Sequence, residues 1–194
     1  AGTVLVQANC DDTYHGSDLG YWSLRCGQPA PFGPEGELLD EYERDLVVRD
    51  RATAYISANR GRLVSVVVPA RVGRMWGVYE PVEQLRRDVH ADRRSFYVSL
   101  LGLAQFALIV PSAVAGAVVV WRRRGPLLVL VAWLPVATLT AATAFGNTRY
   151  RTAAETSLVV LAAVAVDALT ARQWPDARPT SAHGPSAQPP GGSS

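Results

Sequence analysis

The chain has 194 residues, 48% of them hydrophobic, and its net charge is +2 because 19 basic residues oppose 17 acidic ones. Residues 1–94 hold 12 arginines and 14 acidic residues, whereas the remainder holds 7 arginines and 3 acidic residues. The first part is therefore close to neutral and has no basic stripe, which excludes the electrostatic footprint of a nucleic-acid-binding protein. We expect no nucleic acid among the partners.

Residues 1–94 are predicted to form a small α/β domain. Val4–Ala8 has the pattern of a buried strand, and turn-forming residues follow it. A helical pattern begins at Glu37 and is expected to end at Asn59-Arg60-Gly61, where glycine suits the left-handed position after a helix. A second helix is expected from about Leu63 to Trp76.

Cys10 and Cys26 are the only cysteines, and they bracket a turn-rich loop of 15 residues. A disulfide closing such a loop would stabilise the fold by about 3 kcal/mol, and it would persist only in an oxidising compartment. Two free thiols are the alternative. A metal site is disfavoured because the chain has no Cys-x-x-Cys motif and its three histidines are scattered. We predict no metal ligands and no cofactor in this chain.

The predicted helix near Leu63–Trp76 carries Arg71 and Arg74 beside an aliphatic face. It is either a helix that packs on the core with solvated arginines, or a helix that rests on a membrane. In the second case Trp76 and Tyr79 would lie among the lipid headgroups, and the arginines would meet lipid phosphate. The sequence leaves both interpretations open.

Two uncharged stretches dominate residues 95–171. Phe96–Trp121 contains no charged residue over 26 positions, and Leu127–Phe145 contains none over 19. The hydrocarbon core of a bilayer needs about 20 apolar residues in a helix, and a soluble helix of this length would show a polar face. The sequence therefore predicts transmembrane helices over residues 95–121 and 127–145.

A third transmembrane helix is expected over residues 156–171, although this segment is shorter and Asp167 interrupts it. Two spans and an interfacial helix are the alternative. The fold class predicted is thus a membrane α-helical protein, with a small α/β extracytoplasmic domain, three or two spans, and a disordered tail over residues 172–194.

The orientation follows from the compact triplet Arg122-Arg123-Arg124. Short basic loops favour the cytoplasm, so residues 122–126 are predicted to form a cytoplasmic turn. Residues 1–94 and the loop 146–155 are then extracytoplasmic, and the tail is cytoplasmic. We expect a multi-pass protein of the cell membrane.

Four separated segments resemble a known family when they are taken in order. They are Asn9-Cys10-Asp11-Asp12-Thr13-Tyr14, Leu19-Gly20-Tyr21-Trp22-Ser23, Ala70-Arg71-Val72-Gly73-Arg74-Met75-Trp76-Gly77-Val78-Tyr79 and Gly146-Asn147-Thr148-Arg149-Tyr150-Arg151. They are similar to the carboxy-terminal half of actinobacterial multi-span membrane glycosyltransferases of the GT-C class, in the superfamily of protein O-mannosyltransferases and aminoarabinose transferases. The resemblance covers about residues 1–171.

The resemblance implies transfer of a sugar from a polyprenyl-phosphate donor to an extracytoplasmic acceptor that the sequence does not identify. The family's catalytic carboxylate lies in its first exterior loop, so this chain is expected to be the carboxy-terminal part of a longer enzyme. It would be inactive alone. We assign no catalytic residue here, and the metal requirement of the full-length enzyme stays open.

Arg149 and Arg151 are the candidates for binding the donor phosphate, because guanidinium groups bind phosphate bidentately. Ordinary anchoring at the membrane interface is the alternative. The family pattern usually continues with prolines, which Thr152–Thr156 lacks. A non-catalytic envelope protein with a small partner-binding exterior domain is the main rival function, and a piece of a transporter or channel is a weaker one.

Overall fold

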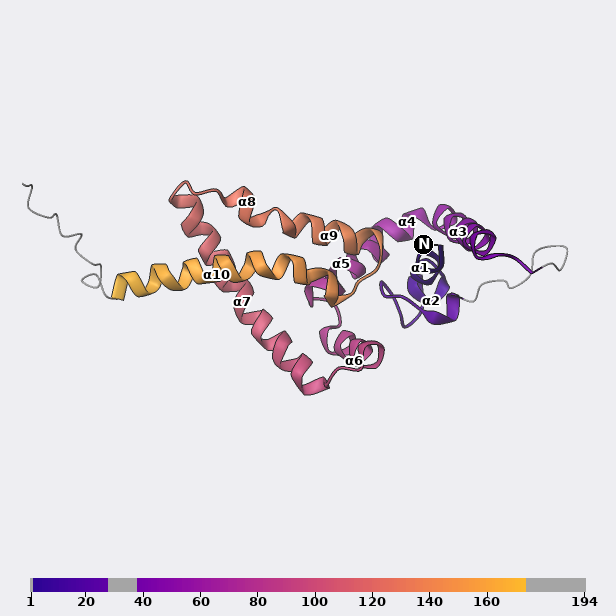
Figure 1. Ribbon diagram of the computed structural model, residues 1–194, viewed down its shortest axis with the longest axis horizontal. Coiled ribbons are helices and arrows are strands. Elements are labelled where there is room, and N and C mark those ends of the chain that lie inside the picture. Colours follow the sequence, from indigo (N-terminus) through magenta and orange to yellow (C-terminus); the bar gives the residue numbers. More distant parts are fainter. Residues whose placement is uncertain (1, 28–37, 174–194) are drawn as a thin grey trace, which may run out of the picture.

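The computed structural model describes residues 2–27 and 38–173, and every regular element in these ranges is helical. Ten α-helices are described: α1 (Gly2–Ala8), α2 (Asp11–Tyr14), α3 (Glu41–Ala58), α4 (Arg60–Arg62), α5 (Val68–Trp76), α6 (Pro81–Asp92), α7 (Phe96–Arg122), α8 (Leu127–Val131), α9 (Trp133–Thr143) and α10 (Thr152–Gln173). Leu24–Cys26 and Thr148–Arg151 are 3-10 turns, η1 and η3, and Leu63–Val67 is a π-turn, η2. In Figure 1, α1 to α4 lie at one end and the long apolar helices extend to the other, with α5 and α6 between them.

The predicted strand at Val4–Ala8 is wrong, because these residues belong to helix α1. α1 packs along α3, where Val6 is buried with Val48 and Ala52. A short apolar run fits a buried strand and a buried helix equally well, so its period could not decide between them. The described part of residues 1–94 is therefore helical and not α/β.

The helix expected from Glu37 begins at Glu41 as α3, and Glu37 itself lies outside the described residues. Asp40 sets the start: its carboxylate accepts the Glu43 backbone N–H at 2.7 Å, and the Glu43 side chain accepts the Asp40 N–H at 3.0 Å. This reciprocal capping satisfies donors that a helix start leaves free. Gly61 does not end the helix in a left-handed conformation as expected, since it lies inside α4.

The second predicted helix is present as η2 followed by α5. Pro69 lacks the N–H that would bond to the Ser65 carbonyl in a regular helix, and the wider π-turn lies where that bond is missing. The left-handed glycine is Gly77, with φ 70°, which ends α5. The N–H of Val78 donates to the Gly73 carbonyl at 2.9 Å and that of Gly77 to the Arg74 carbonyl at 3.1 Å, the bonding pattern of a Schellman motif.

Two helical segments are long and apolar enough to cross a membrane, Phe96–Arg122 and Thr148–Ala171. The segment expected to be weakest, residues 156–171, therefore lies in one of the two strongest candidates. The predicted span over residues 127–145 appears as a shorter apolar pair of helices, Leu127–Thr143. This pair breaks at Ala132, because Pro135 has no N–H to offer the Val131 carbonyl.

Most of the apolar surface of these two helical segments faces outward. Only 22% and 28% of their most apolar stretches are buried within the chain. Large apolar side chains on α7 such as Tyr97, Leu101, Leu108 and Trp121 are each at least 70% exposed. Exposed apolar surface of this extent marks contact with lipid or with further protein. Of the predicted tail, Arg172 and Gln173 belong to α10, and residues 174–194 lie outside the described residues.

Helices α7 and α10 cross, and Gly116 allows the close approach. A Cβ on Gly116 would overlap the carbonyl oxygen of Leu161, and Ala113 and Ala165 are buried nearby. Small residues at a crossing let two backbones approach closely. Figure 1 shows the two helices separating on either side of this crossing.

We expect Gly116→Ala to destabilise the protein by about 1–3 kcal/mol, the usual cost of overpacking, because the added methyl group overlaps the Leu161 carbonyl. Thermal unfolding of the purified protein in detergent would measure this. Gly102→Ala is the matched control, since nothing lies within 4 Å of a Cβ built there. Equal melting temperatures for the two variants would contradict the assigned crossing.

Candidate functional site

Helix α5 lies where the four segments of the family resemblance meet. Its Arg71 side chain bonds to Ala8 and Asn9, and its Arg74 side chain bonds to Leu19. The N–H of Gly146 donates to the Gly20 carbonyl at 2.8 Å. A Cβ on Gly146 would lie 2.5 Å from the Arg71 carbonyl oxygen, so only glycine fits between this loop and α5. Segments spread over more than 140 residues of sequence thus form one polar junction around α5.

Arg71 is 2% exposed, and its guanidinium group donates hydrogen bonds to oxygen atoms of other segments. Nη2 donates to the Ala8 carbonyl at 2.6 Å and to Asn9 Oδ1 at 3.0 Å, while Nη1 donates to the Ala142 carbonyl at 3.2 Å. The Tyr14 hydroxyl donates to the same Asn9 oxygen at 2.9 Å. Burial lowers the pKa of Arg71 and raises the pKa of Tyr14, the latter against the opposing effect of the Arg71 charge.

Arg74 is fully buried. Nε donates to the Leu19 carbonyl at 2.6 Å, Nη1 to Gln84 Oε1 at 3.3 Å and Nη2 to Glu80 Oε2 at 2.8 Å. The Tyr79 ring lies 5.0 Å from the guanidinium carbon, a cation–π contact. Neither environment expected for Arg71 and Arg74, solvent or lipid headgroups, is found, because carbonyl groups and side chains of other segments surround both.

Trp76 also lies against other helices. Its Nε1 donates to Thr138 Oγ1 at 3.2 Å, and its ring stacks on Phe106 with centroids 6.3 Å apart. The Schellman turn at Gly77 then brings Tyr79 back over α5, where its Cβ lies 2.8 Å from where a Gly73 Cβ would be. Trp76 and Tyr79 therefore hold α5 to its neighbours, a role that the sequence did not indicate.

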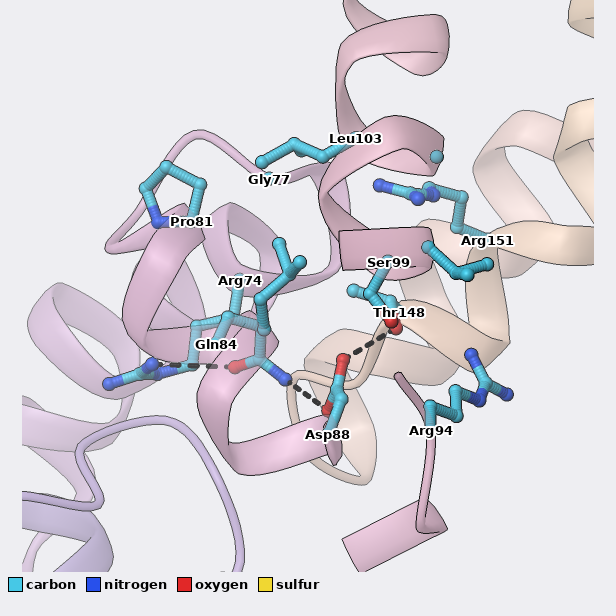
Figure 2. A pocket seen from close by; sticks show the side chains of 13 residues that line it. Arg74, Gly77, Pro81, Gln84, Asp88, Arg94, Ser99, Leu103, Thr148 and Arg151 are labelled. Atoms are coloured by element: carbon cyan, nitrogen blue, oxygen red, sulfur yellow. Dashed lines mark hydrogen bonds between the residues drawn. The ribbon is translucent and has the colours of Figure 1, made fainter. Parts of the chain in front are cut away.

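A buried carboxylate, Asp88 on α6, connects α5, α6 and the loop before α10. Its Oδ1 accepts the Gln84 amide at 2.9 Å and the Tyr21 hydroxyl at 3.3 Å, and its Oδ2 accepts the Thr148 hydroxyl at 2.7 Å. Figure 2 shows the chain of bonds from Arg74 through Gln84 and Asp88 to Thr148. This network positions the residues that follow Thr148. Sequence analysis missed Asp88; its only signal is the four-residue spacing from Gln84.

Arg151, the last residue of η3, is 9% exposed. Its Nε donates to Glu155 Oε1 at 2.7 Å, and its guanidinium carbon lies 3.9 Å from the Phe106 ring centroid. Its Nη1 is buried without a hydrogen-bond acceptor among the described residues. Figure 2 shows the side chain extending toward Gly77 and Leu103. A buried charged donor without an acceptor is costly. Arg71 Nε and Arg87 Nε are buried in the same way, but of these three arginines only Arg151 lines the cavities described next.

Two adjoining cavities surround Arg151, and we call them together the arginine hollow. Their volumes are about 230 and 290 Å³, and both are lined by Arg94, Gly102, Thr148 and Arg151. The second is also lined by Arg149 and Glu155. The first is also lined by Arg74 and Asp88. Four arginines and two carboxylates thus line the hollow, so it suits an anionic group. The structure brings both predicted phosphate-binding residues, Arg149 and Arg151, to this site.

Arg94 is the arginine that sequence analysis did not assign to the site. It lies two residues before α7, as Arg151 lies directly before α10. The signal was available in the sequence, since a basic residue precedes both apolar segments. What the sequence did not indicate is that Arg94 and Arg151 line the same two cavities.

The predicted Cys10–Cys26 disulfide is present, with a Cα–Cα distance of 6.2 Å. It closes the loop that carries Tyr21 and Asp12. The Ser23 hydroxyl donates to Asp12 Oδ2 at 3.1 Å, and the Ser23 N–H donates to the Gln7 carbonyl at 3.0 Å. The disulfide therefore closes the segment that carries Tyr21, whose hydroxyl bonds to Asp88 in the lining of the hollow.

No metal site is evident in the part of the chain that the structure describes, since no three His, Cys, Asp or Glu side chains gather there. Asp11 and Asp12 form local bonds. Asp11 contacts His15 at 3.1 Å and accepts the Tyr55 hydroxyl at 3.4 Å, and Asp12 contacts Arg25 at 3.1 Å.

Comparison with known proteins yields no match to a family model, a curated protein or a solved structure.

Replacing Arg71 should destabilise the junction more than replacing an exposed arginine does. Arg71→Met removes three hydrogen bonds. The Ala8 carbonyl keeps the Thr13 hydroxyl and Asn9 Oδ1 keeps the Tyr14 hydroxyl, so the Ala142 carbonyl is the acceptor that loses its donor, at a cost of about 1–3 kcal/mol. Arg51→Met on the exposed face of α3 is the control. Unfolding in detergent followed by circular dichroism would measure both variants. Equal stabilities would show that Arg71 does not stabilise the junction around α5.

Proposed function

We propose that this chain is the carboxy-terminal part of an integral membrane glycosyltransferase that uses a polyprenyl-phosphate sugar donor. The observation that supports this most is the arginine hollow, which lies where the two long apolar helices begin. A lipid-linked phosphate in a bilayer sits at that boundary between polar headgroups and hydrocarbon. The four segments of the family resemblance also meet around α5, beside the hollow.

The proposed membrane arrangement is multi-pass, with α7, the pair α8 and α9, and α10 as three crossings. α7 and α10 both begin near α5 and α6 (Figure 1), so residues 1–94 and the Gly146–Glu155 loop would share one side. The Cys10–Cys26 disulfide favours an oxidising, extracytoplasmic side. The exposed triplet Arg122–Arg124 at the opposite end of α7 favours the cytoplasm.

The chemistry proposed for the hollow is stabilisation of the leaving phosphate. When the bond from the sugar to the phosphate breaks, negative charge develops on the phosphate oxygens. Preorganised cationic donors at that position lower the barrier. Arg151 is held in place by Glu155 and Phe106, so it does not need to reorganise. The binding site for the acceptor and the catalytic base are proposed to lie on the earlier part of the longer enzyme.

An anchored partner-binding protein is the second candidate. It is favoured by the exposed apolar side chains of α3, since Tyr42, Leu46 and Val47 are 70%, 40% and 39% exposed. Such a face would bind further protein. In a glycosyltransferase the same face would contact the earlier part of the enzyme.

In the full-length enzyme, Arg151→Ala and Arg149→Ala should each lower sugar transfer from a polyprenyl-phosphate sugar. Loss of one charge-stabilising donor typically costs about 10²–10³ in rate. We expect the larger loss for the buried Arg151 and the smaller for the exposed Arg149. Initial rates with radiolabelled donor in membranes would measure this, and Arg122→Ala at the other end of α7 is the control.

Arg151→Lys separates a folding defect from loss of the anion site, because it keeps the charge and removes the bidentate geometry. It should lower transfer while the melting temperature stays near that of the unmodified enzyme. Transfer by the 194-residue chain alone, or full activity of an inserted Arg149/Arg151 double alanine variant, would contradict the proposal.

The membrane orientation has its own test. In a background without Cys10 and Cys26, single cysteines at the exposed positions Asp50 and Arg123 should differ in labelling by a membrane-impermeant maleimide. We expect labelling of intact cells at position 50 and labelling at position 123 only after the membrane is opened. The reverse pattern would invert the orientation.

A further inference from the structure

We propose that the hollow continues as a lipid path in which the wedge between α7 and α10 holds the isoprenoid chain of a prenyl monophosphate. In this arrangement Arg94 is a third phosphate-binding residue beside Arg149 and Arg151. The inference rests on the proposed function for the identity of the lipid. It adds the position of the isoprenoid chain, and it can be tested by ligand binding alone.

The wedge follows from how the two helices cross. α7 and α10 touch at Gly116 and Leu161 and separate toward their amino-terminal ends (Figure 1). The second cavity of the hollow, about 290 Å³, lies between the separated parts. Its lining extends from Arg151, at the end of η3, to Val159 on α10, which is about 12 Å at the helical rise per residue.

The lining of this cavity changes from charged to apolar along its length. Arg94, Arg149 and Arg151 lie where the helices begin, and Phe106, Ile109 and Val159 lie further along them. A ligand that fits both ends has an anionic head and an apolar tail. Inorganic phosphate would leave the apolar part unfilled, and a neutral prenyl alcohol would bring no anionic oxygen to Arg151 Nη1.

Arg151 provides independent evidence that the head of this ligand is an anion. Its side chain is nine-tenths buried, and its Nη1 has no acceptor among the described residues. Glu155 binds Nε and the Phe106 ring lies against the guanidinium plane, so the free N–H is fixed in direction. A phosphate oxygen supplies the acceptor that this donor lacks, in a charge-assisted hydrogen bond.

A second groove on the other side of α10 offers a comparison. Its volume is about 370 Å³, and its lining includes Val129, Trp133 and Val160 but no charged residue. An apolar chain could lie in this groove, but a phosphate would find no cation in its lining. The two grooves are separated by α10, so the neighbouring residues Val159 and Val160 line one each.

The test is binding of farnesyl phosphate to the 194-residue chain in detergent micelles, measured by isothermal titration. Farnesol and inorganic phosphate are the two half-ligands, and we expect each to bind at least tenfold more weakly. Phosphatidic acid carries the same headgroup charge on a two-chain lipid and should also bind at least tenfold more weakly. Equal binding of farnesol, of inorganic phosphate or of phosphatidic acid would overturn the assignment to a prenyl monophosphate.

Val159→Trp and Val160→Trp form a matched pair, since the two valines are neighbours on α10 and are 51% and 43% exposed. Val159→Trp should weaken farnesyl phosphate binding at least tenfold by filling the wedge, and Val160→Trp should leave binding unchanged. Arg94→Gln should weaken it several-fold, with unchanged binding of farnesol. Melting temperatures of the two tryptophan variants should agree, which excludes unfolding as the cause.

The outcomes separate this inference from the glycosyltransferase proposal. The opposite pattern, with Val160→Trp weakening binding, would overturn the wedge as the chain path. If the wedge variants behave as expected but Arg149 and Arg151 variants of the full-length enzyme transfer sugar normally, the lipid site stands and the enzymatic proposal fails. If sugar transfer depends on Arg149 and Arg151 but the Val159→Trp variant binds farnesyl phosphate normally, only the proposed position of the isoprenoid chain fails.

Discussion

Two buried guanidinium groups on one nine-residue helix hold this structure together. Burying a charged group is costly unless its hydrogen bonds are satisfied. Arg74 and the two Nη atoms of Arg71 donate mainly to carbonyl and side-chain oxygens from other segments, while Arg71 Nε has no acceptor among the described residues. The acceptors come from before α2, from the Leu19 segment, from the turn before α6, from α6 and from the end of α9. Each arginine therefore joins parts of the chain that are distant in sequence.

The arginine hollow depends on this junction. Gly146 lies against the backbone of Arg71, and Thr148 is bonded to Asp88, which Gln84 connects to Arg74. These contacts fix the start of η3 and so the direction of Arg151. The candidate anion site is thus positioned by interior residues that do not touch an anion themselves. Residues that act in this way are easily mistaken for surface arginines or membrane anchors when only the sequence is known.

The same junction also sets how the apolar helices are arranged. α5 packs against α9 and η3, and α6 packs against α7, so the starts of α7 and α10 are brought to one side. Their crossing at Gly116 then leaves the space between them open toward the arginines. Charge at the helix starts and apolar surface along the helices together form a site suited to an amphipathic anion.

Sequence by itself determined the features that depend on neighbouring residues or on bulk composition. The uncharged run of α7, the helical periodicity of α3 and the pairing of Cys10 with Cys26 were all predictable, because each follows from local spacing or from the lack of another partner. Tertiary structure decided the rest. Val4–Ala8 is helical because it packs along α3, and Arg71 is buried because its acceptors lie 62 to 71 residues away in the chain. Arg94 joins Arg151 only because the packing of α5, α6 and η3 brings the residues before α7 and α10 to the same cavities. A pattern in the sequence reports which side chains share a face, but the partner of that face is set by packing between distant segments.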